Sequence, residues 1–231
     1  MKKIIDRIKG LFRKSGQEVP EPKWVDSSQN QFGISLLDLR SSVFITTAWT
    51  TRKDIAESFL RMRRANGAEY VNRLPDDYVE FESSLSFAYS GTHQEGPVFK
   101  ARAMEDKWDM YVYEDRLYIS RSWTGNLCFV ALCEFKSNRV EIHRIFAEKK
   151  FISDDVQYAG RVVDCLIKSH MSNMVVPHPL PARLKGEPLG ELAVHSYEIF
   201  GRRGLFGSFD ETIGILGQQA AAPDGQEAGR G

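Results

Sequence analysis

The fold is decided by residues 104–125, which read MEDKWDMYVYEDRLYISRSWTG. Two runs rich in aromatic and β-branched residues flank a charged break at residues 114–116. Such runs favour β-strands, and a short polar break between them is typical of a hairpin turn. The stretch therefore predicts a β-hairpin with charged residues and both Trp108 and Trp123 near its open end.

Arg121 is the residue of this hairpin whose burial would be costly. Side chains alternate between the two faces of a strand, so Arg121 shares a face with apolar neighbours. These neighbours are Leu117, Ile119 and Trp123. A buried arginine without a carboxylate is strongly destabilising. Glu105 and Asp106, which lie just before the partner strand, are therefore its predicted partners.

Two interpretations of this charged end remain open. In the first, the guanidinium of Arg121 and nearby hydroxyl groups bind an anion. The candidate ligand-binding residues are then Arg121, Ser122, Trp123, Thr124 and Trp108. The candidate catalytic residues are Glu105, Asp106 and Arg121. In the second interpretation the charges form an internal ion pair that only holds the hairpin together, which is the more common role of such pairs.

The same hairpin carries a sequence signature. Residues 104–108 (MEDKW) are followed by Leu117-Tyr118 and by residues 121–125 (RSWTG). This pattern resembles that of a family of uncharacterised bacterial proteins. The resemblance implies a bacterial, cytoplasmic protein, and it implies no activity.

The segments around the hairpin predict a larger sheet. Turn-forming residues interrupt residues 98–147 at intervals that are typical of an antiparallel meander. Residues 127–135 are apolar on both faces, which predicts a central strand covered on both sides. Apolar residues at helical spacing predict helices near residues 52–65 and 154–171. The expected fold class is α+β, with an antiparallel meander sheet of roughly five to seven strands packed by two main helices.

Further strands are predicted at residues 34–39, 42–49 and 192–200, where β-branched and aromatic residues are frequent. The tail is rich in Gln, Ala, Pro and Gly, a composition that favours disorder. The expected organisation is a basic leader helix at residues 1–14, a linker at 15–22, a single α+β domain at 23–216 and a disordered tail at 217–231.

The predicted leader helix is amphipathic. Its apolar residues lie on one side of a helical wheel and its basic residues on the other. The apolar residues are Ile4, Ile5, Ile8, Leu11 and Phe12. Such a helix can bind an anionic membrane surface or dock on a protein, although one short helix binds a membrane only marginally. We expect a cytoplasmic protein, with peripheral contact to the inner membrane face through residues 1–14 as one option.

The composition limits the classes of function. Lys and Arg number 31, as do Asp and Glu, so the net charge is zero, which argues against a nucleic-acid partner. Cys128, Cys133 and Cys165 form no Cys-x-x-Cys pair and are expected to be reduced core residues. No His or Cys cluster has the spacing of metal ligands, so neither a metal nor a cofactor is expected. His170 falls on the apolar face of a predicted helix and is expected to be a core histidine.

Residues 201–207 place glycines around Arg202 and Arg203. Glycine lets a backbone approach a phosphate group, and arginine binds it well. A turn with solvated arginines is nevertheless the more common role of such a segment.

The function predicted from the sequence is a non-enzymatic binding or interaction module. No complete nucleophile–base pair or metal site is recognisable, and aromatic residues on the hairpin would supply a contact surface. These residues are Trp108, Trp123, Tyr111, Tyr113 and Tyr118. The alternative is an enzyme or binder that acts on a phosphate- or carboxylate-bearing small molecule through Arg121 and Glu105 or Asp106. The expected partner is thus a protein or a small anionic ligand.

Overall fold

The computed structural model describes residues 21–45, 48, 50–89, 91, 94–152 and 155–214. The predicted leader at 1–14, most of the linker at 15–22 and the tail at 217–231 lie outside these residues. Among the described helices, none combines the length and the apolar character needed to cross a membrane.

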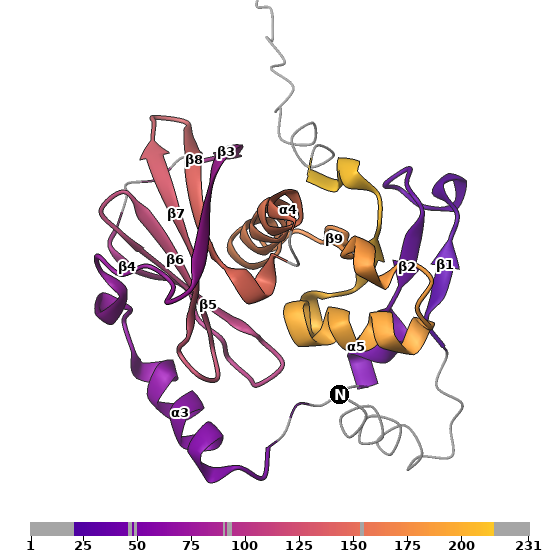
Figure 1. Ribbon diagram of the computed structural model, residues 1–231, viewed down its shortest axis with the longest axis horizontal. Coiled ribbons are helices and arrows are strands. Elements are labelled where there is room, and N and C mark those ends of the chain that lie inside the picture. The colour runs from indigo at the N-terminus through magenta and orange to yellow at the C-terminus, as the bar shows by residue number, and fades with distance from the viewer. Residues whose placement is uncertain are drawn as a thin grey trace, which may run out of the picture.

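A six-stranded antiparallel sheet dominates the fold (Figure 1), and it confirms the predicted α+β class and meander. Its strands, in chain order, are β3 (Tyr78–Ala88), β4 (Gly96–Phe99), β5 (Trp108–Tyr113), β6 (Arg116–Arg121), β7 (Leu127–Phe135) and β8 (Arg139–Glu148). Strands β4 to β8 are neighbours in sequence order, and β3 pairs with the outer edge of β8. The predicted hairpin is β5–β6, in which Trp108 lies opposite Arg121.

Helices cover both faces of this sheet. On one face lies α4 (Val156–Leu166), which continues into a wider helical turn at Ile167–Met171. Asp155 caps α4, because its carboxylate accepts hydrogen bonds from the first free backbone N–H groups. On the other face α3 (Lys53–Arg64) packs through Met62. Both predicted helices are confirmed, and β7 is the central strand expected from its sequence.

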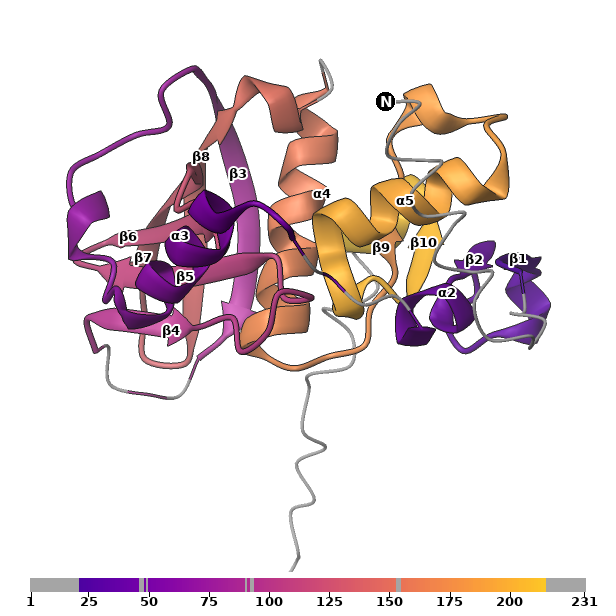
Figure 2. The same cartoon turned by 90° about the horizontal axis from the view of Figure 1, so that it is seen from below.

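A second, smaller sheet was not predicted. Its strand order is β1 (Lys23–Val25), β2 (Leu36–Asp38), β10 (Phe206–Ser208) and β9 (His178–Pro179), with β9 and β10 parallel. It packs around its own core of buried leucines and a valine, namely Leu37, Leu39, Val43, Leu180, Leu184 and Leu192. Figure 2 shows this part of the molecule beside α4, on the side away from the large sheet.

Two predicted strands are wrong. Residues 42–45 of the predicted strand at 42–49 belong to a short helix, α2 (Arg40–Ile45). The Asp38 carboxylate caps the start of this helix. The segment at 192–200 is the end of helix α5 (Leu189–Phe200). The buried positions of α5 recur every fourth residue, at Leu192, Ser196 and Phe200. The polar Ser196 interrupts this apolar stripe, so the helical period is not evident in the sequence.

The large sheet and α5 meet at the open end of the hairpin. The last carbonyl groups of a helix have no partner within the helix. Here the Trp108 indole donates to the carbonyl of Ile199 at 2.6 Å, and Arg121 donates to the carbonyl of Glu198 at 3.0 Å. After the helix, Gly201 adopts a φ of +58°. The hairpin therefore caps α5 across the junction of the two sheets.

Gly201→Ala is expected to destabilise the protein by about 3 kcal/mol or more. A Cβ at this position would lie 1.9 Å from the backbone oxygen of Glu105, at a positive φ that side chains disfavour. Urea denaturation measures the loss. Gly190→Ala is the matched control, because a Cβ there meets nothing within 4 Å and lies on exposed helix. It should gain up to about 1 kcal/mol, and equal losses for both variants would contradict the close contact.

Candidate functional site

Arg121 lies where strand alternation places it, but without the expected acid. Its guanidinium stacks 4.6 Å from the ring centre of Trp108, and its Nη1 is buried without a hydrogen-bond partner in the part of the chain that the structure describes. Burial lowers the pKa of Arg121. The expected ion pair of Arg121 with Glu105 or Asp106 is wrong, because other groups bind both carboxylates.

Asp106 instead binds Arg202, which follows α5. Its two carboxylate oxygens accept from Nε and Nη2 of Arg202 at 2.6 and 2.7 Å. The same buried carboxylate accepts from the backbone N–H of Arg102 at 2.9 Å. Glu105 accepts from the backbone N–H of Ala48 at 2.9 Å. Asp106, one of the two predicted ion-pair partners of Arg121, therefore joins the hairpin to the segment after α5.

The other candidate binding residues of the hairpin donate to, or accept from, the backbone. The Ser122 hydroxyl donates to the carbonyl of Asp106 at 2.7 Å, and the Trp123 indole donates to the carbonyl of Met104 at 2.8 Å. The Thr124 hydroxyl accepts from the backbone N–H of Asn126 at 3.3 Å. These bonds hold the open end of the hairpin together, and a ligand-binding role for these residues stays a prediction.

The predicted aromatic contact surface is wrong for three of its five members. Trp108 and Tyr111 are 0% exposed and Tyr118 is 1% exposed. They fill the two faces of the sheet, so they are not available to a partner.

Lys107 is a buried cation that the sequence did not single out. Only 5% of the residue is exposed. Its ammonium group lies 4.6 Å from the ring centre of Trp123 and 4.5 Å from that of Tyr197, and it donates to the carbonyl of Met104. Burial, and then the neighbouring charge of Arg121, lowers the pKa of Lys107 to about 8.

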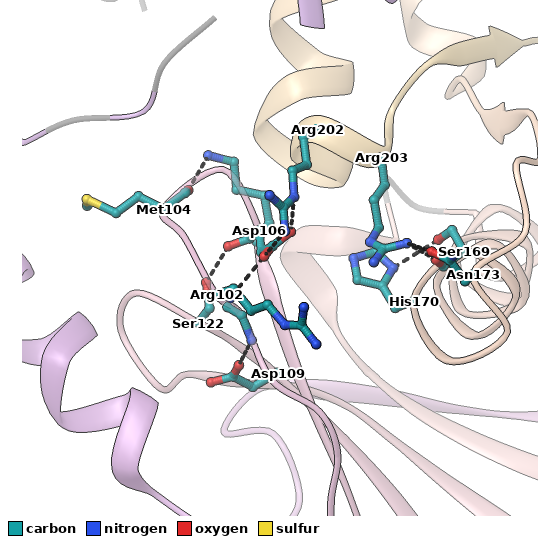
Figure 3. A network of polar contacts seen from close by, with 12 residues as sticks. Arg102, Met104, Asp106, Asp109, Ser122, Ser169, His170, Asn173, Arg202 and Arg203 are labelled. Carbon is teal, nitrogen blue, oxygen red and sulfur yellow. Dashed lines mark hydrogen bonds and ion pairs between the residues drawn. The ribbon is translucent and has the colours of Figure 1, made fainter. Parts of the chain in front are cut away.

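On the other side of Asp106, three arginines gather from distant parts of the chain. We call Arg102, Arg202 and Arg203 the arginine cluster (Figure 3). Burial lowers the pKa of Arg203, and the charges of Arg202 and Arg102 lower it further against the opposing effect of Asp106. The guanidinium of Arg202 binds Asp106, and the charges of Asp106, Arg202 and Arg102 all act on Arg203. Arg202 and Arg203 come from the basic glycine-flanked segment recognised in the sequence.

The guanidinium of Arg203 is hydrogen-bonded through Nη1, whereas its Nε has no hydrogen-bond partner among the described residues. Its Nη1 donates to the carbonyl of Ser169 and, at 3.1 Å, to the side-chain oxygen of Asn173. Its guanidinium lies 5.1 Å from the ring centre of Phe99. Its Nε is buried and has no partner among the described residues.

His170 lies beside Arg203, as Figure 3 shows. It is 4% exposed, as expected of a core histidine, and its ring meets Phe99 edge to face at 4.8 Å between ring centres. Burial, followed by the charge of Arg203, lowers the pKa of His170 to about 3. The imidazole is therefore neutral at pH 7. Its Nε2 is buried without a partner among the described residues, and no pattern in the sequence indicates this.

Two other groups of reactive residues are accounted for structurally. Glu134, Glu141 and His143 place ligand atoms within 4.8 Å of one another on β7 and β8. Lys136 and Arg139 already form ion pairs with these carboxylates, which leaves little negative charge for a metal ion. The three cysteines are buried and free, as expected of core residues.

Comparison of the chain with protein-family models, with curated proteins and with solved structures finds no match.

Removing Asp106 should cost more stability than removing Arg121. Asp106→Ala leaves Arg202 without its carboxylate and is expected to cost about 3 kcal/mol or more. Arg121→Met replaces a cation without an ion pair by an apolar chain and should change stability by no more than about 1 kcal/mol, or increase it. Urea denaturation compares the two variants. Similar losses would show that Arg121 depends on a carboxylate.

Lys107 should make the folded state more stable as the pH rises from about 8 to 10.5. Its folded pKa of about 8 lies below the ordinary value of 10.5, so in this window the unfolded chain holds more protons and stability increases with pH. Relative to wild type, Lys107→Met should lose roughly 3 kcal/mol of this increase. Urea denaturation across the window measures it, with the exposed Lys53→Met as control. Parallel curves for wild type and Lys107→Met would contradict the lowered pKa.

Proposed function

We propose that the protein is a non-enzymatic binding module that takes an anionic, phosphate- or carboxylate-bearing small molecule at the arginine cluster. The observation that carries this proposal is the charge of the cluster. Among the described residues, Asp106 forms an ion pair with Arg202 alone, and the charges of Asp106, Arg202 and Arg102 all act on Arg203. In a chain with no net charge, this local excess of two positive charges favours an anionic ligand.

The geometry of Arg203 supports the same conclusion. Guanidinium groups bind phosphate and carboxylate through several parallel hydrogen bonds. Arg203 has a buried Nε that donates to no described residue. Leaving such a donor unsatisfied is costly, and an anionic oxygen would satisfy it.

Binding is favoured over catalysis by the state of the reactive groups. Asp106, the candidate base, is held by both Arg202 and the backbone of Arg102. His178 lies 2.8 Å from the hydroxyl of Ser196, but both residues are closed to solvent. Neither arrangement offers a base beside the arginine cluster, and His170, which does lie there, is a weak base because burial lowers its pKa to about 3. A bacterial, cytoplasmic setting and membrane contact through residues 1–14 stay predictions from the sequence.

Arg203→Ala and Arg102→Ala should each weaken the binding of inorganic phosphate or citrate by about tenfold or more, because each removes charge-assisted hydrogen bonds. Isothermal titration calorimetry on the full chain measures the affinity, and the melting temperature without ligand shows whether each variant is folded.

Arg63→Ala is the matched control for that experiment, because Arg63 lies on α3, at the other face of the sheet. It should bind both anions as wild type does. The proposal fails if wild type binds neither anion, or if all three variants bind as well as wild type.

A further inference from the structure

The hydrogen bonds around His170 determine which of its ring nitrogens carries the proton. Nδ1 lies 3.2 Å from the carbonyl oxygen of Leu166 and 2.9 Å from the hydroxyl oxygen of Ser169. A carbonyl oxygen can only accept. The Ser169 hydroxyl has one proton, which it donates to the carbonyl of Cys165 at 2.6 Å. Both neighbours therefore accept from Nδ1, which must carry the hydrogen.

It follows that Nε2 of His170 is a bare acceptor, because a neutral imidazole has one N–H and one lone pair. This lone pair is buried and meets no donor among the described residues. The side chain of Arg203 lies next to His170 (Figure 3), and its Nε–H is buried and meets no acceptor among the described residues. A buried acceptor and a buried donor are thus left unsatisfied on two neighbouring side chains, although buried polar groups are almost always hydrogen-bonded.

Resting on the proposed anion-binding function, we infer that the ligand of the arginine cluster is an oxyanion that carries its own proton, namely a phosphate group in its hydrogen phosphate form. Its charged oxygens bind Arg203 and the other two arginines, and its P–O–H group donates to Nε2 of His170. Sulfate has the same shape but no proton at neutral pH. It would set an oxygen lone pair against the nitrogen lone pair.

Binding in this way requires the side chain of Arg203 to move. Nε2 is closed to solvent, whereas Arg203 is partly exposed. The charged groups that act on His170 are Arg203, Arg202 and Asp106. Two of these three are arginines, so the phosphate is held by charge as it donates its hydrogen bond to the ring.

The test is isothermal titration calorimetry of the full chain with inorganic phosphate and with sulfate at neutral pH. Wild type should bind phosphate about tenfold or more tightly than sulfate, because an unmade buried hydrogen bond reduces affinity by about that factor. His170→Asn keeps a donor on the Ser169 side and removes the acceptor. It should lose most of the preference and still bind sulfate. His170→Gln can return an acceptor to the position of Nε2 and should retain the preference.

The outcomes separate this inference from the proposed function. If neither anion binds, the proposed function fails and the inference falls with it. If both anions bind wild type equally, the cluster binds anions but His170 does not select among them. A phosphate preference that persists in His170→Asn also overturns the inference.

A second measurement avoids the risk that the variants misfold. Nitrogen-15 NMR of the wild-type histidines should show His170 protonated at Nδ1. Its Nε2 signal should shift with phosphate and not with sulfate. A proton found on Nε2, or no response of that signal to phosphate, would overturn the inference.

Discussion

The rest of the structure depends on how the end of α5 is capped. The carbonyls of Glu198 and Ile199 have no partner within the helix, and side chains of the hairpin donate to both. In return, the backbone N–H of Arg202 donates to the carbonyl of Glu105. Because donors on each side of the junction bond to acceptors on the other, these bonds fix the position of the large sheet against α5.

The same junction explains why the buried Asp106 pairs with Arg202 and not with Arg121. A carboxylate is best satisfied by a guanidinium that approaches with two parallel N–H groups. Arg202 can do so because the backbone contact beside it holds the chain close to Asp106. Arg121 is stabilised differently, by the ring of Trp108 and one helix carbonyl. One cation is paired and the other is shielded by an aromatic ring, although both lie next to the hairpin.

The pairing of Asp106 also creates the imbalance on which the proposed function rests. The Asp106 carboxylate is taken up by Arg202, so the charges of Arg102 and Arg203 remain in excess where the segment after α5 meets α4 and the hairpin. The neutral imidazole of His170 lies behind this charge with its Nε2 lone pair unused. Positive charge attracts any small anion, whereas a bare nitrogen distinguishes anions with a proton from those without one. Attraction and selectivity are therefore assigned to different residues.

The sequence by itself determined the hairpin, the meander and the helices α3 and α4, because their hydrophobic periods are local and repeat over many residues. It also identified Arg121 as inward-facing and residues 201–207 as a basic segment. Only the tertiary structure decided the second sheet, whose strands have two or three residues each and show no readable period. It alone decided that Asp106 meets Arg202, since these residues are 96 positions apart. A sequence gives the number of charges, but which acid meets which arginine depends on the folded backbone that brings them into contact.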